Sequence, residues 1–354
     1  MTTLYLTEQH SVVKKDGDTL VVHIPEDKER GTEKRKVRVP LIKIDQVVVQ
    51  GDSTITTPAL LALLEQGAEV CFCSYYGKFQ GRLSPEFSKN ALIRIEQHRR
   101  HNDPAQALEL ARCFVQGKLS NMRTLLLRSN RKRDDRAVAR AATDIKGVLE
   151  QIGQVQHDPD VSIDPAKPQA GSAWGTLLGL EGSGTAFYFG AFERLLKQDL
   201  GFKGRKKRPP TDPVNALLSY GYVLLMNNVM SAINLVGFDP YIGYLHSSQY
   251  GKPALALDLM EEFRAIVVDS VVLTVINNGI LQRDDFQEEL GTYRLTDKGR
   301  RTFLTKFEER LDAEIQHPVF NYKATYRKCL ELQVRLLSKY LTGEIPAYQP
   351  FTVR

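Results

Sequence analysis

The chain has 354 residues, of which 42% are hydrophobic and 25% charged, the balance of a globular protein with room for two or three domains. No apolar run reaches the roughly 18 residues of a membrane-spanning helix. The first ten residues lack the basic and apolar regions of a secretory signal. We therefore expect a cytoplasmic protein without a membrane span.

The net charge of +6 is distributed unevenly along the chain. Much of the positive charge falls in two runs, residues 123–140 and 203–208. Clustered Lys and Arg side chains attract polyanions, whereas a solvated helix face is the alternative explanation. Because the runs flank a set of candidate metal ligands, we favour DNA contact. The predicted DNA-contacting residues are Arg131, Lys132, Arg133, Arg205, Lys206, Lys207 and Arg208.

Residues 1–86 predict a small, mostly antiparallel β-rich domain with one short helix. Alternating apolar residues interrupted by DGD at 16–18 indicate a hairpin, and Pro58 and Gly67 bound the helix. Cys71 and Cys73 lie in a run typical of a buried strand. A zinc site would usually need a second cysteine pair, and the sequence has none. We therefore expect reduced thiols that pack as small apolar side chains.

Residues 87–354 predict a large all-α domain. Several segments repeat apolar residues with the 3.6-residue period of a helix. Residues 157–172 contain three prolines and predict a loop, and residues 291–300 predict a short hairpin. The expected fold class is α+β, with a small β-rich N-terminal domain followed by a large all-α catalytic domain.

An acidic patch occurs in the predicted helix ALALDLMEEFR. Asp258 lies three residues before Glu261 and four before Glu262, so the three side chains should share one face. Carboxylates so close together repel one another unless a cation lies between them. The patch therefore predicts either a metal site or a solvated face paired with basic residues such as Arg264.

Two further candidate ligands lie elsewhere in the sequence. His246 is in a loop punctuated by glycine and proline, just before the acidic helix, although a surface role is common for such a histidine. Glu181 begins a helical stretch of small residues, where it could instead compensate the helix dipole. One imidazole with several carboxylates suits magnesium or manganese, and nearby basic runs suggest chemistry on a phosphodiester.

The chain resembles the CRISPR-associated integrase of spacer acquisition, the metal-dependent endonuclease subunit of the adaptation complex. The resemblance covers nearly the whole chain, and its combination of motifs is highly specific. The matching segments are LYLTEQ, QGKLSNMRTLLLR, LLGLEGSGTAFYFGAF, RPPTDPVNALLSYGYVLL, GFDPYIGYLH, LALDLMEEFR and VVDSVVLTVIN.

The resemblance implies a catalytic α-helical domain at residues 87–354 and an N-terminal domain that forms a homodimer. It implies a magnesium or manganese ion held by Glu181, His246 and Glu261, with Asp258 supporting the site. Asp258 would do so either as a hydrogen-bond acceptor behind the ligands or as a ligand of a second metal ion. Some family members have aspartate where this chain has Glu261. The resemblance also implies DNA as a partner, together with a small companion protein of ferredoxin-like fold that bridges two dimers.

We expect a phosphoryl transfer in which the 3′-hydroxyl of a short DNA fragment attacks a phosphodiester at the edge of a CRISPR repeat. One alternative is a metal-dependent, structure-specific nuclease of DNA repair, with water as the nucleophile. Another is a non-enzymatic scaffold that only holds DNA ends. The integrase and the nuclease would use the same residues, so only their reaction products would distinguish the two enzymes.

Overall fold

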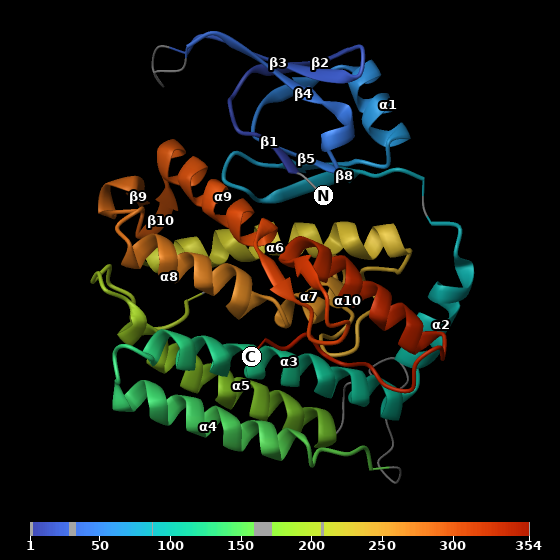
Figure 1. The fold of residues 1–354 in the computed structure, drawn as a ribbon, viewed down its shortest axis with the longest axis vertical. Helices are drawn as coiled ribbons and strands as arrows, with labels where there is room; N and C mark the ends of the chain where they lie inside the picture. Colours follow the sequence, from blue (N-terminus) through green and yellow to red (C-terminus); the bar gives the residue numbers. More distant parts are fainter. Residues whose placement is uncertain (1–2, 28–32, 87, 159–171, 207–208, 354) are drawn as a thin grey trace. The chain divides into compact units, whose positions relative to one another are not determined.

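The computed structural model describes residues 3–27, 33–86, 88–158, 172–206 and 209–353. The chain divides into two compact units, Met1–Phe87 and Ser88–Arg354 (Figure 1). Lys207 and Arg208, two of the predicted DNA contacts, lie outside the described residues.

One sheet of the first unit has the strand order β1-β5-β7-β8. Strands β1 (Thr3–Leu6), β5 (Gln46–Gln50) and β7 (Glu69–Cys73) run parallel to one another, and β8 (Phe79–Leu83) is antiparallel to β7. Helix α1 (Thr57–Glu65) connects the chain back to β7. Parallel neighbours need such a crossover, since a tight turn can only produce an antiparallel pair.

The other sheet has the order β4-β3-β2-β6. Strands β2 (Ser11–Asp16), β3 (Thr19–Ile24) and β4 (Arg35–Pro40) form an antiparallel meander, and β6 (Ser53–Ile55) pairs parallel to β2. Three of the six strand pairings in the described unit are therefore parallel, so the expectation of a mostly antiparallel module is wrong. Local turn signals predict hairpins, but they do not report pairing between distant strands.

The predicted buried strand with two cysteines is confirmed as β7. Cys71 and Cys73 are both buried, and their Sγ atoms lie 3.9 Å apart. All four cysteines fall within the described residues and form no disulfide.

The second unit is mainly helical, so the predicted fold class is confirmed. Two hairpins interrupt the helices: β9 (Phe286–Glu289) with β10 (Thr292–Leu295), and β11 (Glu314–Gln316) with β12 (Lys323–Thr325). The second hairpin was not predicted, because its strands have only three residues each. The helices are α2 (Ala91–His101), α3 (Pro104–Asn130), α4 (Arg136–Ile152), α5 (Ser172–Phe192), α6 (Pro213–Val236), α7 (Ala254–Glu261), α8 (Ser270–Asn277), α9 (Asp297–Asp312) and α10 (Tyr326–Leu341).

Helices α3, α4 and α5 pack side by side in the lower part of this unit (Figure 1). Helix α6 is long and apolar enough to cross a membrane by length and composition alone, but 67% of its most apolar window is buried in the protein. That burial is typical of a core helix. Helix α6 packs against α7, α10 and the π-helical turn Arg264–Asp269, which continues the chain after α7.

Candidate active site

The three acidic residues at α7 have three different partners. Asp258 contacts the preceding loop, Glu261 contacts α3, and Glu262 contacts the C-terminal segment. Their exposed fractions are 0%, 4% and 0%. The structure thus differs from the single shared acidic face expected from the spacing. Neighbouring elements enclose the helix, so each carboxylate is compensated separately.

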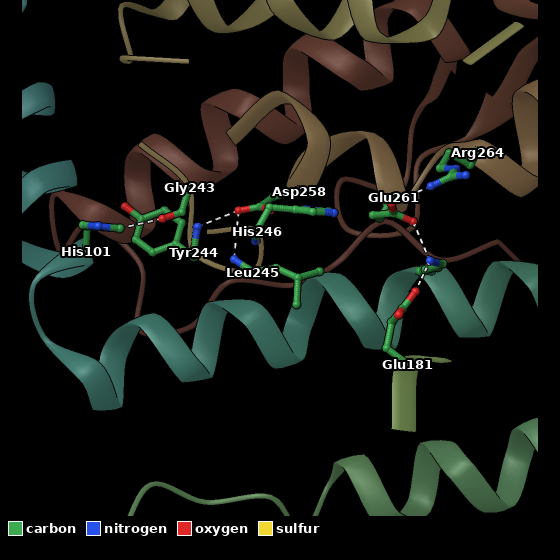
Figure 2. Close-up of polar contacts among 10 residues, drawn as sticks. His101, Glu181, Gly243, Tyr244, Leu245, His246, Asp258, Glu261 and Arg264 are labelled. Carbon is green, nitrogen blue, oxygen red and sulfur yellow. Dashed lines mark hydrogen bonds and ion pairs between the residues drawn. The ribbon is translucent and has the colours of Figure 1, made fainter. Parts of the chain in front are cut away.

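Asp258 organises the loop that carries His246. Its carboxylate accepts hydrogen bonds from the backbone N–H groups of Tyr244 at 2.5 Å, Leu245 at 3.0 Å and His246 at 2.9 Å. It also lies 2.7 Å from Nδ1 of the His246 ring (Figure 2). A carboxylate accepts here, so Nδ1 donates this hydrogen bond and Nε2 is the ring nitrogen left to bind a metal ion.

Helix α2 holds the same loop from another side. The buried Gln97 amide donates to the carbonyls of Asp239 at 2.7 Å and Ile242 at 2.8 Å. Nδ1 of His101 lies 2.6 Å from the carbonyl oxygen of Gly243. A Cβ at Gly243 would come within 2.7 Å of the Asp258 carboxylate, so only glycine permits this approach. The predicted loop histidine is therefore held in one place.

Glu181 lies in the middle of α5, because the helix begins at Ser172. The alternative that it compensates the dipole of a helix N-terminus is therefore wrong. The small residues of α5 permit a close approach to α3: a Cβ at Gly184 would lie 2.7 Å from the side chain of Leu119. This contact brings α5 close enough for Glu181 to reach the interior beside α3.

Lys118 on α3 joins two of the predicted ligands. Its ammonium pairs with Oε1 of Glu181 and lies 2.9 Å from Oε2 of Glu261. In Figure 2 the two glutamates extend toward the same point beside α3, one from α5 and the other from α7. The Lys118 side chain is 6% exposed, so this is a buried cation shared by two carboxylates.

Arg264 supplies the second cation beside Glu261. Its guanidinium lies 2.6 Å from Oε1 of Glu261 and stacks 4.0 Å from the ring of Tyr222. Burial alone would raise the pKa of Glu261, but the charges of Arg264, Lys118 and His246 hold that pKa well below its ordinary value. Glu261 is therefore ionised, as a metal ligand must be.

Glu262 is part of the core. Its carboxyl oxygens accept hydrogen bonds from the Tyr348 hydroxyl and the Phe351 backbone N–H, each at 2.6 Å. Burial raises the pKa of Glu262 to about 8. Of the two adjacent glutamates, only Glu261 faces the other predicted ligands.

The predicted ligands fit a divalent cation by their chemistry. Across the described ranges, no three His, Cys, Asp or Glu side chains already form a metal-binding cluster. Glu181 and Glu261 nevertheless converge on one cation, the Lys118 ammonium, which supplies positive charge between them. The His246 charge acts on Glu261 across the same region. Two carboxylates and an imidazole suit magnesium or manganese.

The predicted DNA contacts fall into two groups in the structure. Arg131, Lys132 and Lys206 are exposed. Arg133 donates to the carbonyls of Arg194 and Leu195, each at 2.6 Å. Arg205 donates to the side chains of Asn215 at 2.8 Å and Ser219 at 3.1 Å. Arg133 is therefore bound to the helical turn Glu193–Leu195, and Arg205 to α6, within the protein itself.

The sequence analysis missed Lys118, Gln97 and His101. A signal for Lys118 was available, because it falls in the apolar stripe of α3 that includes Phe114, Val115 and Leu119. A lysine in such a stripe has to find an acidic partner inside the protein. Gln97 and His101 had no such signal, since both act on loop carbonyls more than 140 positions away in the sequence.

Comparison with known proteins identifies the family. Residues 4–309 match the profile of the family described as CRISPR associated protein Cas1. The chain belongs to the Cas1 family. The predicted family is thus confirmed.

Among Cas1 relatives, the chain is 39% identical to a CRISPR-associated exonuclease Cas4/endonuclease Cas1 fusion of Geobacter sulfurreducens, over 99% of this chain and 60% of that protein. It is 35% identical to a CRISPR-associated endonuclease Cas1 of Thermus thermophilus, over 99% of this chain and 97% of the relative. Relatives of the Cas1 family are thus named as endonucleases, and the predicted enzyme class is confirmed. Cas1 endonucleases are generally metal-dependent nucleases.

Solved structures show the same fold. A casposase bound to an integration product matches with a TM-score of 0.84 at 24% identity, over 99% of this chain and 93% of that chain. A Cas6-RT-Cas1–Cas2 complex matches with a TM-score of 0.75 at 25% identity, over 100% of this chain and 36% of that chain. These matches show that the chain shares the fold of both proteins.

Proposed function

We propose that this Cas1 protein joins the 3′-hydroxyl of a short DNA fragment to a phosphodiester at the edge of a CRISPR repeat. One observation carries the proposal: Glu181 and Glu261, from different helices, converge on one buried cation. Nearby, His246 is oriented by the buried Asp258. Such an arrangement suits phosphoryl transfer, in which charge stabilisation and positioning supply most of the catalysis.

In this proposal Glu181, His246 and Glu261 hold a magnesium or manganese ion. A bound divalent ion would polarise the phosphate and stabilise the charge of the transition state. Asp258 binds Nδ1 of His246 and orients the ring, which leaves Nε2 as the nitrogen that would bind the metal ion. Arg264 keeps Glu261 ionised and oriented. Asp258 is thus a positioning residue, since three backbone N–H groups and His246 already occupy its carboxylate.

We expect Arg131 and Lys132 to contact the DNA backbone. The double variant R131A/K132A should weaken binding of duplex DNA and lower the slope of log affinity against log salt by about 2, because each phosphate contact contributes about 1. Fluorescence anisotropy across a salt series measures both quantities. Arg140, also exposed but paired with Asp144, provides a matched control. An unchanged salt slope in the double variant would remove this surface from the DNA path.

The assembly follows from the same family assignment. We propose that residues 1–86 form a homodimer interface and that residues 87–354 form the catalytic domain. A small companion protein of ferredoxin-like fold would bridge two dimers. A matching solved structure is named as a complex of Cas1 with Cas2, which supports a protein partner for this chain.

The second candidate is a nuclease that uses water as its nucleophile. The relatives named as endonucleases favour hydrolysis as an activity of the same site. The third candidate, a DNA scaffold without catalysis, would not need an ionised buried carboxylate beside an oriented histidine. The nature of the product distinguishes all three.

A strand-transfer assay tests the proposal. The protein and its companion would be mixed with a labelled duplex bearing 3′-hydroxyl ends and a supercoiled plasmid carrying a repeat, with manganese, magnesium or a chelator. Label joined to the plasmid, and lost on chelation, is the expected result. Cleavage without joining would contradict the integrase hypothesis and support the nuclease. DNA binding without either product would leave only the scaffold.

A further inference from the structure

Lys118 places a cation between Glu181 and Glu261, two of the three proposed metal ligands. Its side chain is 6% exposed and contacts two carboxylates from two helices. An ammonium ion buried to this degree is stable only with close anionic partners. Glu181 and Glu261 are those partners, and both are proposed metal ligands.

Two cations contact the two proposed carboxylate ligands directly. Glu181 and Glu261 contribute two negative charges, and Lys118 and Arg264 contribute two positive charges. Without the ammonium, Arg264 alone would compensate the two carboxylates, and Arg264 contacts only Glu261 among them. Lys118 therefore keeps Glu181 and Glu261 together at one place.

A divalent ion between the same two carboxylates would bring two further positive charges next to the ammonium. Like charges a few ångströms apart in a buried site repel strongly. Glu261 is also held by Arg264 at 2.6 Å, and Glu181 accepts a hydrogen bond from the Thr185 hydroxyl at 3.1 Å, whereas Lys118 has a long, flexible side chain. The ammonium is thus the group that can move.

We infer that Lys118 is a positioning residue that occupies the metal site in the metal-free protein and is displaced when the divalent ion binds. It holds the ligands ready, and it competes with the metal for them. This inference rests on the proposed metal site. It adds that the metal affinity of this chain is set by competition with its own lysine.

Manganese binding measured by electron paramagnetic resonance tests the competition directly. In K118M, which keeps the apolar stem and loses the charge, we expect manganese to bind about tenfold more tightly or better, because the repulsion is gone. K118R keeps the charge and should bind like the wild type. R123M is the matched control on the same helix, since Arg123 donates to a backbone carbonyl, that of Ala142.

The stability of the same variants gives a second readout. K118M should melt at a lower temperature than the wild type in chelator and recover when manganese is added, because the metal replaces the missing cation. Fluorescence of the single tryptophan, the buried Trp174 on α5, reports the transition. A purely structural lysine would lower the melting temperature equally with and without manganese.

The wild-type protein provides a test that does not depend on a folded variant. Reductive methylation followed by mass spectrometry should find Lys118 protected in chelator and reactive with manganese. The exposed Lys146 should react equally in both conditions. Unchanged protection of Lys118 in manganese would overturn the displacement.

The outcomes separate this inference from the proposed function. If the wild type binds manganese but K118M binds it equally or more weakly, the competition is wrong and the metal site stands. If neither protein binds manganese, the proposed metal site and the inference both fail. Tighter binding in K118M, with its control R123M unchanged, supports both.

Discussion

Replacing His246 with alanine should lower strand transfer by at least about a hundredfold, because a metal ligand contributes several kcal/mol of charge stabilisation in the transition state. The fold should persist. The His246 side chain is 29% exposed, and the hydrogen bond from its backbone N–H to Asp258, at 2.9 Å, does not depend on the side chain. Tyr244 and Leu245 continue to hold the loop through the same carboxylate.

The assay is joining of labelled DNA to plasmid, with Trp174 fluorescence as the check on folding. His98 is exposed on α2, so H98A is a matched histidine control that should join DNA like the wild type. Normal joining by H246A would remove His246 from the site and, with it, the proposed ligand set.

Replacing Asp258 with alanine should cause the largest loss of stability. The change leaves the buried N–H groups of Tyr244 and Leu245 and the N–H of His246 without their acceptor. At about 1–3 kcal/mol for each unsatisfied buried group, we expect a loss of about 3–5 kcal/mol in the free energy of unfolding. Joining by the folded fraction should also fall about 10- to 100-fold, because His246 loses its orienting partner.

Urea unfolding followed by Trp174 fluorescence measures this loss. Asp239 lies in the same loop, and its carboxylate accepts a hydrogen bond from the N–H of Tyr241 at 2.8 Å. The control D239A should therefore cost about 1 kcal/mol. A D258A variant as stable as D239A would show that Asp258 does not organise the loop.

The fold was predictable to the extent that it depends on local patterns. Helical periodicity located most of the second unit, and alternating residues located the strands of the first. The parallel pairing of β1, β5 and β7 was not predictable, because it joins residues 3–6 to 46–50 and 69–73. Strands β11 and β12 were not predictable either, because three residues each are too few to show an alternating pattern.

The sequence by itself determined the family, the kind of chemistry and the candidate ligands Glu181, His246 and Glu261, since the residue types and motifs carry that information. Tertiary structure alone decided how nearby acids divide their roles: Asp258 orients a loop and Glu262 joins the core. It also revealed Lys118 between two glutamates. These roles depend on which charges meet inside the protein, and helix packing, rather than spacing along the chain, sets those distances.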